Sequence, residues 1–197
     1  MPTTDAGPSR RPARELLLAA AARLFYAQGV AATGIDTITA EAGVAKKSLY
    51  NNFSSKAELV AAYLEARHEE WLALYRKRVD TAATPGDRVL AVFDAYRDHA
   101  NFAYEHGFRG CGLLNAAAEL PVGNAGRLTV RKHKEEVEEL LAQPVRELLP
   151  DEPERADITA RHLSFLLEGA MARAGLEGGD KCLQDARLIA GQILAAL

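Results

Sequence analysis

Residues 42–59, AGVAKKSLYNNFSSKAEL, place a Gly-Val turn, two lysines, a tyrosine and two asparagines in a span too short to form a domain by itself. Within it Leu49 and Phe53 lie four residues apart, so a helix from Lys46 to about Phe53 brings both to one side. Polar residues occupy the remaining faces. The pattern predicts a short helix that is anchored by two apolar side chains and presents a polar surface.

Two more helices are predicted before this one. The first begins at Ala13 and ends near Gly29, and its apolar residues recur at helical spacing: Leu17, Ala20, Ala21, Leu24 and Phe25. The second covers residues 35–42 and closes at the Gly43-Val44 turn. Three short helices with a tight glycine turn before the third are the plan of a helix-turn-helix unit, whose third helix enters the major groove of DNA.

The polar residues on the third helix are of the types that bind DNA. Lysine ammonium groups meet phosphates or guanine acceptors, an asparagine can form two hydrogen bonds with adenine, and a tyrosine hydroxyl can hold a phosphate. Lys56, at the start of the next helix, adds a positive charge. The alternative is a merely solvated polar helix face, and the arrangement of all three helices together favours DNA.

Charge and composition indicate a folded protein with a local basic region. The 197-residue chain carries a net charge of -3 and is 48% hydrophobic, which argues against coating nucleic acid through bulk positive charge. Residues 1–78 hold 11 Lys/Arg against 8 Asp/Glu, whereas residues 79–197 hold 13 against 19. The distant cysteines Cys111 and Cys182 suggest neither a disulfide nor a zinc site, and no apolar run approaches the ~20 residues that span a bilayer. We expect a soluble cytoplasmic protein without metal, cofactor or membrane contact.

The remaining chain is predicted to be helical, since no segment alternates with period two. After a flexible tail, residues 1–12, the fold class is all-α, with an N-terminal helix-turn-helix DNA-binding domain over residues 13–56 and a larger helical effector-binding and dimerisation domain over residues 57–197. The second domain is expected to contain helices over residues 56–79, 89–106, 128–149, 158–174 and 181–197, with a short apolar piece before Glu119. Pro144 is expected to kink or split its helix.

The first 60 or so residues carry a longer set of matching elements in a fixed order. They are Leu17, Ala20, Ala21, Leu24, Phe25, Gly29, Thr33, Ile35, Ile38, Ala42-Gly43-Val44, Leu49-Tyr50, Phe53, Ser55-Lys56 and Glu58-Leu59. In these residues the chain resembles the tetracycline-repressor (TetR) family of bacterial regulators, and beyond them it matches only in helical layout. The resemblance assigns DNA contacts to Thr33, Lys46, Lys47, Ser48, Tyr50, Asn51, Asn52 and Lys56. Arg10, Arg11 and Arg14 either contact DNA or belong to a solvated tail.

The resemblance implies a transcriptional regulator, more commonly a repressor, that binds a palindromic operator as a homodimer. Because a unit of this size reads few base pairs, two copies are needed for specificity. The last two predicted helices carry apolar and small residues at helical spacing, and we expect them to pair with their copies through Phe165, Leu166, Gly169, Ala172, Leu183, Ala186, Ile189, Ile193 and Leu197. The alternative is an ordinary internal pair of core helices.

The resemblance also implies a small-molecule effector bound among the helices of the second domain. The candidate pocket residues are Tyr63, Arg67, Trp71, Tyr96, Phe102, Cys111, Leu114, Asn115, Phe165 and Glu168, each of which could equally be core. Their apolar and aromatic bias points to a mainly hydrophobic effector with one or two polar groups. Asn115 stands among apolar residues, where it needs a hydrogen-bond partner such as a backbone carbonyl. The effector is expected to release DNA by shifting the long helix that starts at Lys56.

Two other classes of protein compete with this interpretation. An all-α enzyme could use His68, His99, His106, His133 or His162, but the sequence lacks a recognisable metal, nucleotide or nucleophile motif. A helical dimer with a degenerate DNA-binding head could act through protein partners. DNA affinity measured against salt separates that alternative from a DNA-binding protein.

Overall fold

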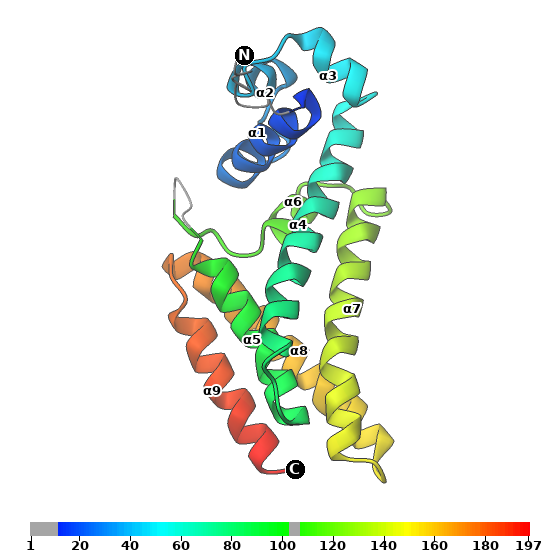
Figure 1. Ribbon diagram of the computed structural model, residues 1–197, viewed down its shortest axis with the longest axis vertical. Helices are drawn as coiled ribbons and strands as arrows, with labels where there is room; N and C mark the ends of the chain where they lie inside the picture. The colour runs from blue at the N-terminus through cyan, green and yellow to red at the C-terminus, as the bar shows by residue number, and fades with distance from the viewer. Residues whose placement is uncertain (1–11, 103–106) are drawn as a thin grey trace, which may run out of the picture. The chain divides into compact units, whose positions relative to one another are not determined.

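The computed structural model describes residues 12–102 and 107–197. Within these ranges the chain forms nine helices and no strand, so the all-α prediction is confirmed (Figure 1). The helices are α1 (Ala13–Gln28), α2 (Ile35–Glu41), α3 (Lys46–Asn52), α4 (Lys56–Val79), α5 (Pro85–Ala100), α6 (Gly112–Ala118), α7 (Ala125–Leu148), α8 (Pro153–Glu177) and α9 (Lys181–Ala195). The predicted tail, including Arg10 and Arg11, lies outside the described residues apart from Pro12, as does His106.

The chain divides into two compact units, Met1–Tyr63 and Leu64–Leu197. The division falls inside α4, whose first two turns belong to the first unit. Among the described helices, none has the length and apolar character that crossing a membrane requires.

The first unit is built around an apolar centre shared by α1, α2, α3 and the start of α4. Its buried apolar side chains include Leu17, Ala21, Phe25, Ile38, Leu49, Phe53, Leu59 and Tyr63. The Phe25 and Tyr63 rings meet edge to face with their centroids 5.4 Å apart, a favourable aromatic geometry. Burial of these side chains against one another fixes three short helices that would be unstable alone.

Two glycines make the turns of the first unit possible. Gly29 ends α1 with a φ of 94°, and Gly43 follows α2 with a φ of 64°. Residues with a Cβ rarely adopt such positive φ values, so glycine is required where the chain reverses between α2 and α3. The predicted glycine turn before the third helix is confirmed.

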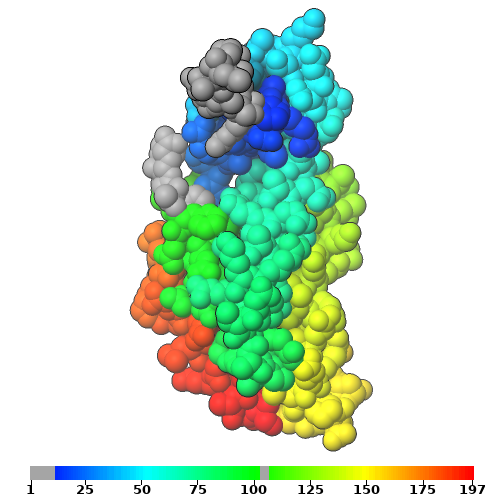
Figure 2. All heavy atoms as spheres, viewed as in Figure 1, coloured from blue at the N-terminus to red at the C-terminus, as the bar shows by residue number. Residues whose placement is uncertain are grey.

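The second unit packs α5, α7, α8 and α9 so that each helix contacts two others: α7 lies against α5 and α8, and α9 lies against the same two helices. Their shared core contains Val92, Phe93, Val137, Leu141, Val145, Leu163, Leu167, Met171 and Leu183, all nearly or fully buried. Figure 2 shows one face of this unit, on which side chains of α4 and α7 meet.

Two helices of this unit differ from the sequence expectation. α5 begins at Pro85 rather than near residue 89, because Thr84 caps it: the Asp87 amide donates to Thr84 Oγ1 at 3.1 Å, and the Asp87 carboxylate accepts from the Thr84 amide at 3.0 Å. Proline suits the first helical position, where its missing N–H costs nothing. α7 continues through the buried Pro144 to Leu148, so this proline does not split the helix.

A backbone contact joins the loop before α6 to α8. Gly110 has a φ of 80°, and a Cβ placed on Gly175 of α8 would lie 2.7 Å from the Gly110 Cα. That distance is too short for a real Cβ contact, so the loop can reach α8 only because both residues are glycines.

Candidate functional site

α3 is fixed to the first unit by its two apolar side chains. Leu49 is fully buried and Phe53, the residue directly after α3, is 1% exposed, so the prediction that this pair faces inward is confirmed. The Arg14 guanidinium of α1 lies 5.1 Å from the centroid of the Phe53 ring, which is a cation–π arrangement. These contacts fix the orientation of the other faces of α3.

Lys47, Tyr50 and Asn51 of α3 are exposed and have DNA-binding chemistry. The Tyr50 side chain is 51% exposed although it is large and aromatic. A lysine, a tyrosine and an asparagine side by side offer a phosphate contact, a hydroxyl and a base-reading amide.

Lys46 is also exposed but is already paired. Its Nζ lies 2.8 Å from Oδ1 of Asp36 on α2, and this hydrogen bond raises the pKa of the Lys46 ammonium. Sequence reasoning missed Asp36, because its ten-residue separation from Lys46 gives no periodic signal. The pair places a carboxylate beside the polar face of α3.

Asn52 and Ser48 are engaged within α3 itself. The Asn52 side-chain amide donates to the Ser48 carbonyl oxygen at 2.7 Å, and both residues are half-buried. This bond uses one of the two N–H groups of the Asn52 amide and holds its orientation toward the backbone.

The structure contradicts the expectation that Thr33 anchors a phosphate. Thr33 is fully buried, and its hydroxyl donates to the Gly29 carbonyl oxygen at 2.6 Å. A buried hydroxyl that already donates inside the fold cannot reach a phosphate. Its role is structural: it satisfies a carbonyl at the end of α1.

The start of α4 is held by a cap that includes a carboxylate. The Ser54 amide and hydroxyl both donate to Glu58 Oε2 at 2.6 Å, and the Glu58 amide donates to Ser55 Oγ at 3.2 Å. These bonds from Ser54 lower the pKa of Glu58. Lys56, half-buried in the first turn of α4, is thereby placed directly after α3.

A small cavity lies in the second unit beside Trp71 of α4. Its volume is about 10 Å³, and its walls are Arg67, Trp71, Tyr96, His99, Cys111, Gly112, Leu113, His133 and Met171. Four of the predicted pocket residues are among them: Arg67, Trp71, Tyr96 and Cys111. Sequence reasoning missed His99, Leu113, His133 and Met171, which come from four helices and share no sequence motif.

The other predicted pocket residues do not line this cavity. Phe165 is 67% exposed on α8, and Leu114 is 37% exposed on α6. Asn115 is half-buried and donates to the Arg109 carbonyl at 2.9 Å, the backbone partner that was the alternative to a ligand. Phe102 contacts the ring of His99 at 5.3 Å between centroids, and Tyr63 lies in the core of the first unit.

Two ion pairs flank the cavity. Arg67 Nη1 lies 2.5 Å from Glu70 Oε2, and the Arg67 guanidinium also contacts the His99 ring. Lys134 Nζ lies 2.8 Å from Glu168 Oε1 and 3.2 Å from the Tyr96 hydroxyl. Each cation beside the cavity therefore has a carboxylate partner.

Burial and charge set the protonation of the groups around the cavity. Burial raises the pKa of the Tyr96 phenol. Burial opposes the charge of Lys134, but the neighbouring Cys111, Tyr96 and Glu168 outweigh it and hold the lysine pKa well above its usual value. At neutral pH the lysine is therefore charged and the phenol neutral.

The two histidines of the cavity are neutral at the same pH. Burial lowers the pKa of His99, and burial together with the charge of Lys134 lowers the pKa of His133 to about 3. The His133 Nδ1 contacts the His68 Nδ1, and the His68 Nε2 lies 3.1 Å from Glu136 Oε2. In the described part of the chain, no group of three or more His, Cys, Asp or Glu side chains could hold a metal ion.

The predicted dimer residues fall on two different faces of α8 and α9. Phe165 and Ile189 are exposed, by 67% and 43%, together with the neighbouring Leu188, by 64%. Leu183 and Ala186 are instead buried inside the unit, where they belong to its core. The outward set on both helices is Ile158, Phe165, Gly169, Ala172, Leu176, Leu188 and Ile189.

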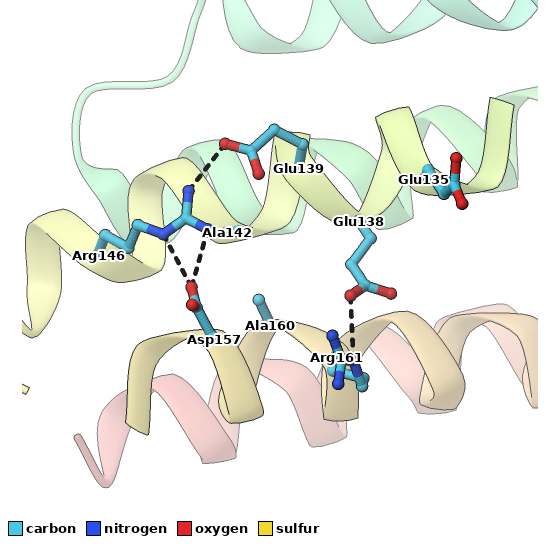
Figure 3. Close-up of a pocket in the computed structure, with 8 residues that line it drawn as sticks. All are labelled: Glu135, Glu138, Glu139, Ala142, Arg146, Asp157, Ala160 and Arg161. Atoms are coloured by element: carbon cyan, nitrogen blue, oxygen red, sulfur yellow. Dashed lines mark hydrogen bonds and ion pairs between the residues drawn. The ribbon is translucent and has the colours of Figure 1, made fainter. Parts of the chain in front are cut away.

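A concave region between α7 and α8 has a volume of about 420 Å³ and is crossed by ion pairs (Figure 3). Arg146 bonds both Glu139 and Asp157 at 2.8 Å, and Arg161 bonds Glu138 at 3.2 Å. A ligand in this region would have to displace these ion pairs. We therefore interpret them as a contact that joins α7 to α8.

Comparisons with known proteins agree on one family. A model described as bacterial regulatory proteins, tetR family, matches residues 17–63. The transcriptional activator FasR of Mycolicibacterium smegmatis is 35% identical over 101 residues, 51% of this chain and 44% of that protein. The transcriptional repressor KstR2 of Mycobacterium tuberculosis is 37% identical over 87 residues, 42% of this chain and 44% of that protein. The chain thus spans less than half the length of these curated relatives.

Structural similarity extends over nearly the whole chain. A TetR-family transcriptional regulator from Streptomyces coelicolor has a TM-score of 0.85 and 29% identity, covering 94% of this chain and 95% of that one. A TetR regulator from Chloroflexus aurantiacus has a TM-score of 0.77 and 26% identity, covering 93% and 94%. The similar proteins are transcriptional regulators, so the alternative of an all-α enzyme is not favoured.

Proposed function

We propose that this chain, which belongs to the TetR family of bacterial regulatory proteins, is a sequence-specific DNA-binding repressor that a small molecule releases from its operator. The observation that carries the proposal is the exposed trio Lys47, Tyr50 and Asn51 on a helix whose opposite side is buried. A fixed helix with these side chains can enter a major groove without reorganising the fold.

The three side chains are proposed to have two roles: contacting DNA phosphates and recognising bases. Lys47 supplies a phosphate contact that depends on charge and is insensitive to base sequence. Asn51 can make paired hydrogen bonds to adenine, which discriminate among bases by about 1–3 kcal/mol. Tyr50 offers a hydroxyl to a phosphate beside them.

The operator-binding form is proposed to be a homodimer. One three-helix unit reads a short half-site, and a twofold dimer reads a palindrome with two of them. The exposed apolar residues of α8 and α9 support this proposal, because such side chains are stabilised when a second copy covers them.

The effector is proposed to be a small, mainly hydrophobic molecule that binds beside Trp71. α4 carries Arg67 and Trp71 of the cavity and also Lys56 in its first turn. A ligand that binds one position of α4 more tightly than another shifts the population between them, and equal affinity for both would leave DNA binding unchanged.

Selection of bound fragments from random or genomic DNA tests the proposal and yields the site with its symmetry. Fluorescence anisotropy on the selected site should then show affinity that falls as salt rises. Lys47→Ala should weaken binding to all DNA sequences and make the slope of log affinity against log salt concentration shallower by about one. Asn51→Ala should instead reduce the difference in affinity between the selected site and other sequences.

Lys77→Ala is the matched control, because it removes an exposed lysine of the second unit. Affinity that does not depend on salt would support the alternative of a protein that acts only through protein partners. A reporter gene placed under the selected site shows whether the protein represses or activates transcription. Deleting the gene of a repressor should raise reporter expression, and deleting the gene of an activator should lower it.

A further inference from the structure

Trp71 has a buried hydrogen-bond donor that the fold leaves unused. The side chain is 2% exposed and lines the cavity in the second unit, and its Nε1–H has no acceptor among the described residues. Buried donors almost always have a partner, because an unmade bond costs free energy. An acceptor group of a ligand in this cavity would supply that partner.

The walls of the cavity favour a flat and largely apolar molecule. Tyr96, His99 and His133 contribute rings, and the Trp71 indole itself lies 5.0 Å from the Tyr96 centroid and 5.5 Å from that of His133. Leu113, Met171 and Cys111 add further apolar and weakly polar surface to the lining. Planar ligands make the most contact with surfaces of this kind.

The charges around the cavity disfavour an ionic ligand. Arg67 is paired with Glu70 and Lys134 with Glu168, and the histidines are held neutral by burial. A charged ligand would have to break one of these pairs or remain without a counter-charge in a region of low polarity, and either is unfavourable.

The present cavity of about 10 Å³ has room for roughly one water molecule. A ligand must therefore move part of the wall. The Met171 side chain can adopt many conformations, and Gly112 has no side chain to obstruct a ligand. The cavity can therefore enlarge at these two positions without breaking an ion pair. Binding then selects an expanded form of the second unit, as a population shift requires.

We infer, on the basis of the function proposed above, that the effector is a neutral planar aromatic molecule whose hydrogen-bond acceptor binds the Trp71 indole N–H. Three probes with the same phenol ring test the inference: 4-hydroxyacetophenone is neutral, 4-hydroxybenzoate is anionic and tyramine is cationic. Isothermal titration calorimetry gives the affinities. Because Trp71 is the single tryptophan of the chain, its fluorescence reports binding at this cavity.

The neutral ketone should bind at least tenfold more tightly than either charged probe and should change the tryptophan fluorescence. Trp71→Phe keeps an aromatic ring but removes the N–H donor. It should therefore lower the affinity for the neutral ketone roughly five- to tenfold, as measured by calorimetry. Tyr75→Phe is the control, because Tyr75 stacks on Trp71 without lining the cavity, and it should leave the affinity unchanged.

Equal or tighter binding of a charged probe, absence of binding by all three, or an unchanged affinity in Trp71→Phe would overturn the inference. Fluorescence anisotropy with the selected DNA measures DNA binding independently of probe binding, and so tests the proposed function separately from the effector class. DNA binding without any probe binding rejects only the effector class, whereas probe binding by a protein that does not bind DNA rejects the proposed function.

Discussion

The Thr33 hydroxyl donates to the Gly29 carbonyl in a fully buried position, at the point where the chain leaves α1. Thr33→Val keeps the shape and removes the donor, which leaves that carbonyl unsatisfied. We expect a loss of about 1–2 kcal/mol in the free energy of unfolding, measured by urea denaturation. DNA affinity per folded molecule should not change.

Thr37→Val is the control, since Thr37 is an exposed threonine on α2. It should leave the free energy of unfolding within about 0.5 kcal/mol of the parent value. If instead Thr33→Val kept full stability and lost DNA affinity, Thr33 would be a phosphate contact after all.

His133 makes the stability of the second unit depend on pH. Burial lowers its pKa to about 3, whereas in the unfolded chain the ring protonates near pH 6.5. Between these values the unfolded state binds a proton that the folded state does not, so the free energy of unfolding falls as pH drops, by at most about 1.4 kcal/mol per pH unit.

His133→Leu removes this titration. Urea denaturation between pH 6.5 and 5 should therefore show a shallower loss of stability than in the parent chain, even if the variant is less stable throughout. Identical slopes in the two proteins would mean that His133 is protonated in the folded state.

At the scale of single residues, sequence reasoning identified residue types better than their surroundings. Leu49 and Phe53 were placed correctly because apolar spacing reports a buried face directly. Thr33 and Asn52 have side chains that could meet DNA or the local backbone equally well, and only the three-dimensional fold shows the backbone partner.

Among the elements, the contact between α8 and the loop before α6 depends on two facing glycines. Gly175→Ala would put a Cβ within 2.7 Å of the Gly110 backbone, and backbone cannot rotate aside. We expect a loss of about 1–3 kcal/mol in the free energy of unfolding, or displacement of the loop. Denaturation and the Trp71 fluorescence spectrum measure these two results.

Gly86→Ala, in the first turn of α5, is the matched control. Its added Cβ would meet Thr84 Oγ1 at an ordinary 3.8 Å, so stability should stay the same or rise by up to about 1 kcal/mol. Similar losses in both variants would show that the cost comes from the substitution type and not from the close contact.

Helix positions followed from periodicity, but several helix ends and faces did not. Apolar spacing placed the start of α5 near residue 89, although Thr84 and Pro85 are residue types that commonly start a helix. α9 has apolar residues on two faces, and spacing alone could not tell that Leu183 faces the internal core while Leu188 faces outward.

For the whole molecule, the proposed dimer predicts that a charge on the outward face of α8 separates the two copies. Phe165→Glu places a carboxylate where a partner would bury an apolar side chain. Sedimentation velocity should show a dimer dissociation constant raised at least about tenfold, with a matching loss of affinity for the full palindrome.

Val122→Glu is the control, because Val122 is 92% exposed and lies in the loop between α6 and α7, outside α8 and α9. It should leave the association unchanged. A Phe165→Glu protein that stays dimeric would locate the interface elsewhere.

The fold class was predictable because each helix carries its own apolar face, and the three-helix head was predictable because its elements follow one another in sequence. The cavity was not, since His99, Cys111, His133 and Met171 come from distant segments. No periodic pattern links residues that meet only after the second unit has packed.

The pairing of Asp36 with Lys46 bears on how such a protein would find its operator within a chromosome. The carboxylate competes with every DNA phosphate for the same ammonium group, on matched and unmatched sequences alike. We expect the Asp36 carboxylate to shorten the residence time on random DNA, because it weakens non-specific binding to phosphates. Shorter residence on unmatched sequences lets the protein reach its operator sooner. Single-molecule tracking should find that Asp36→Asn dwells longer on unrelated DNA.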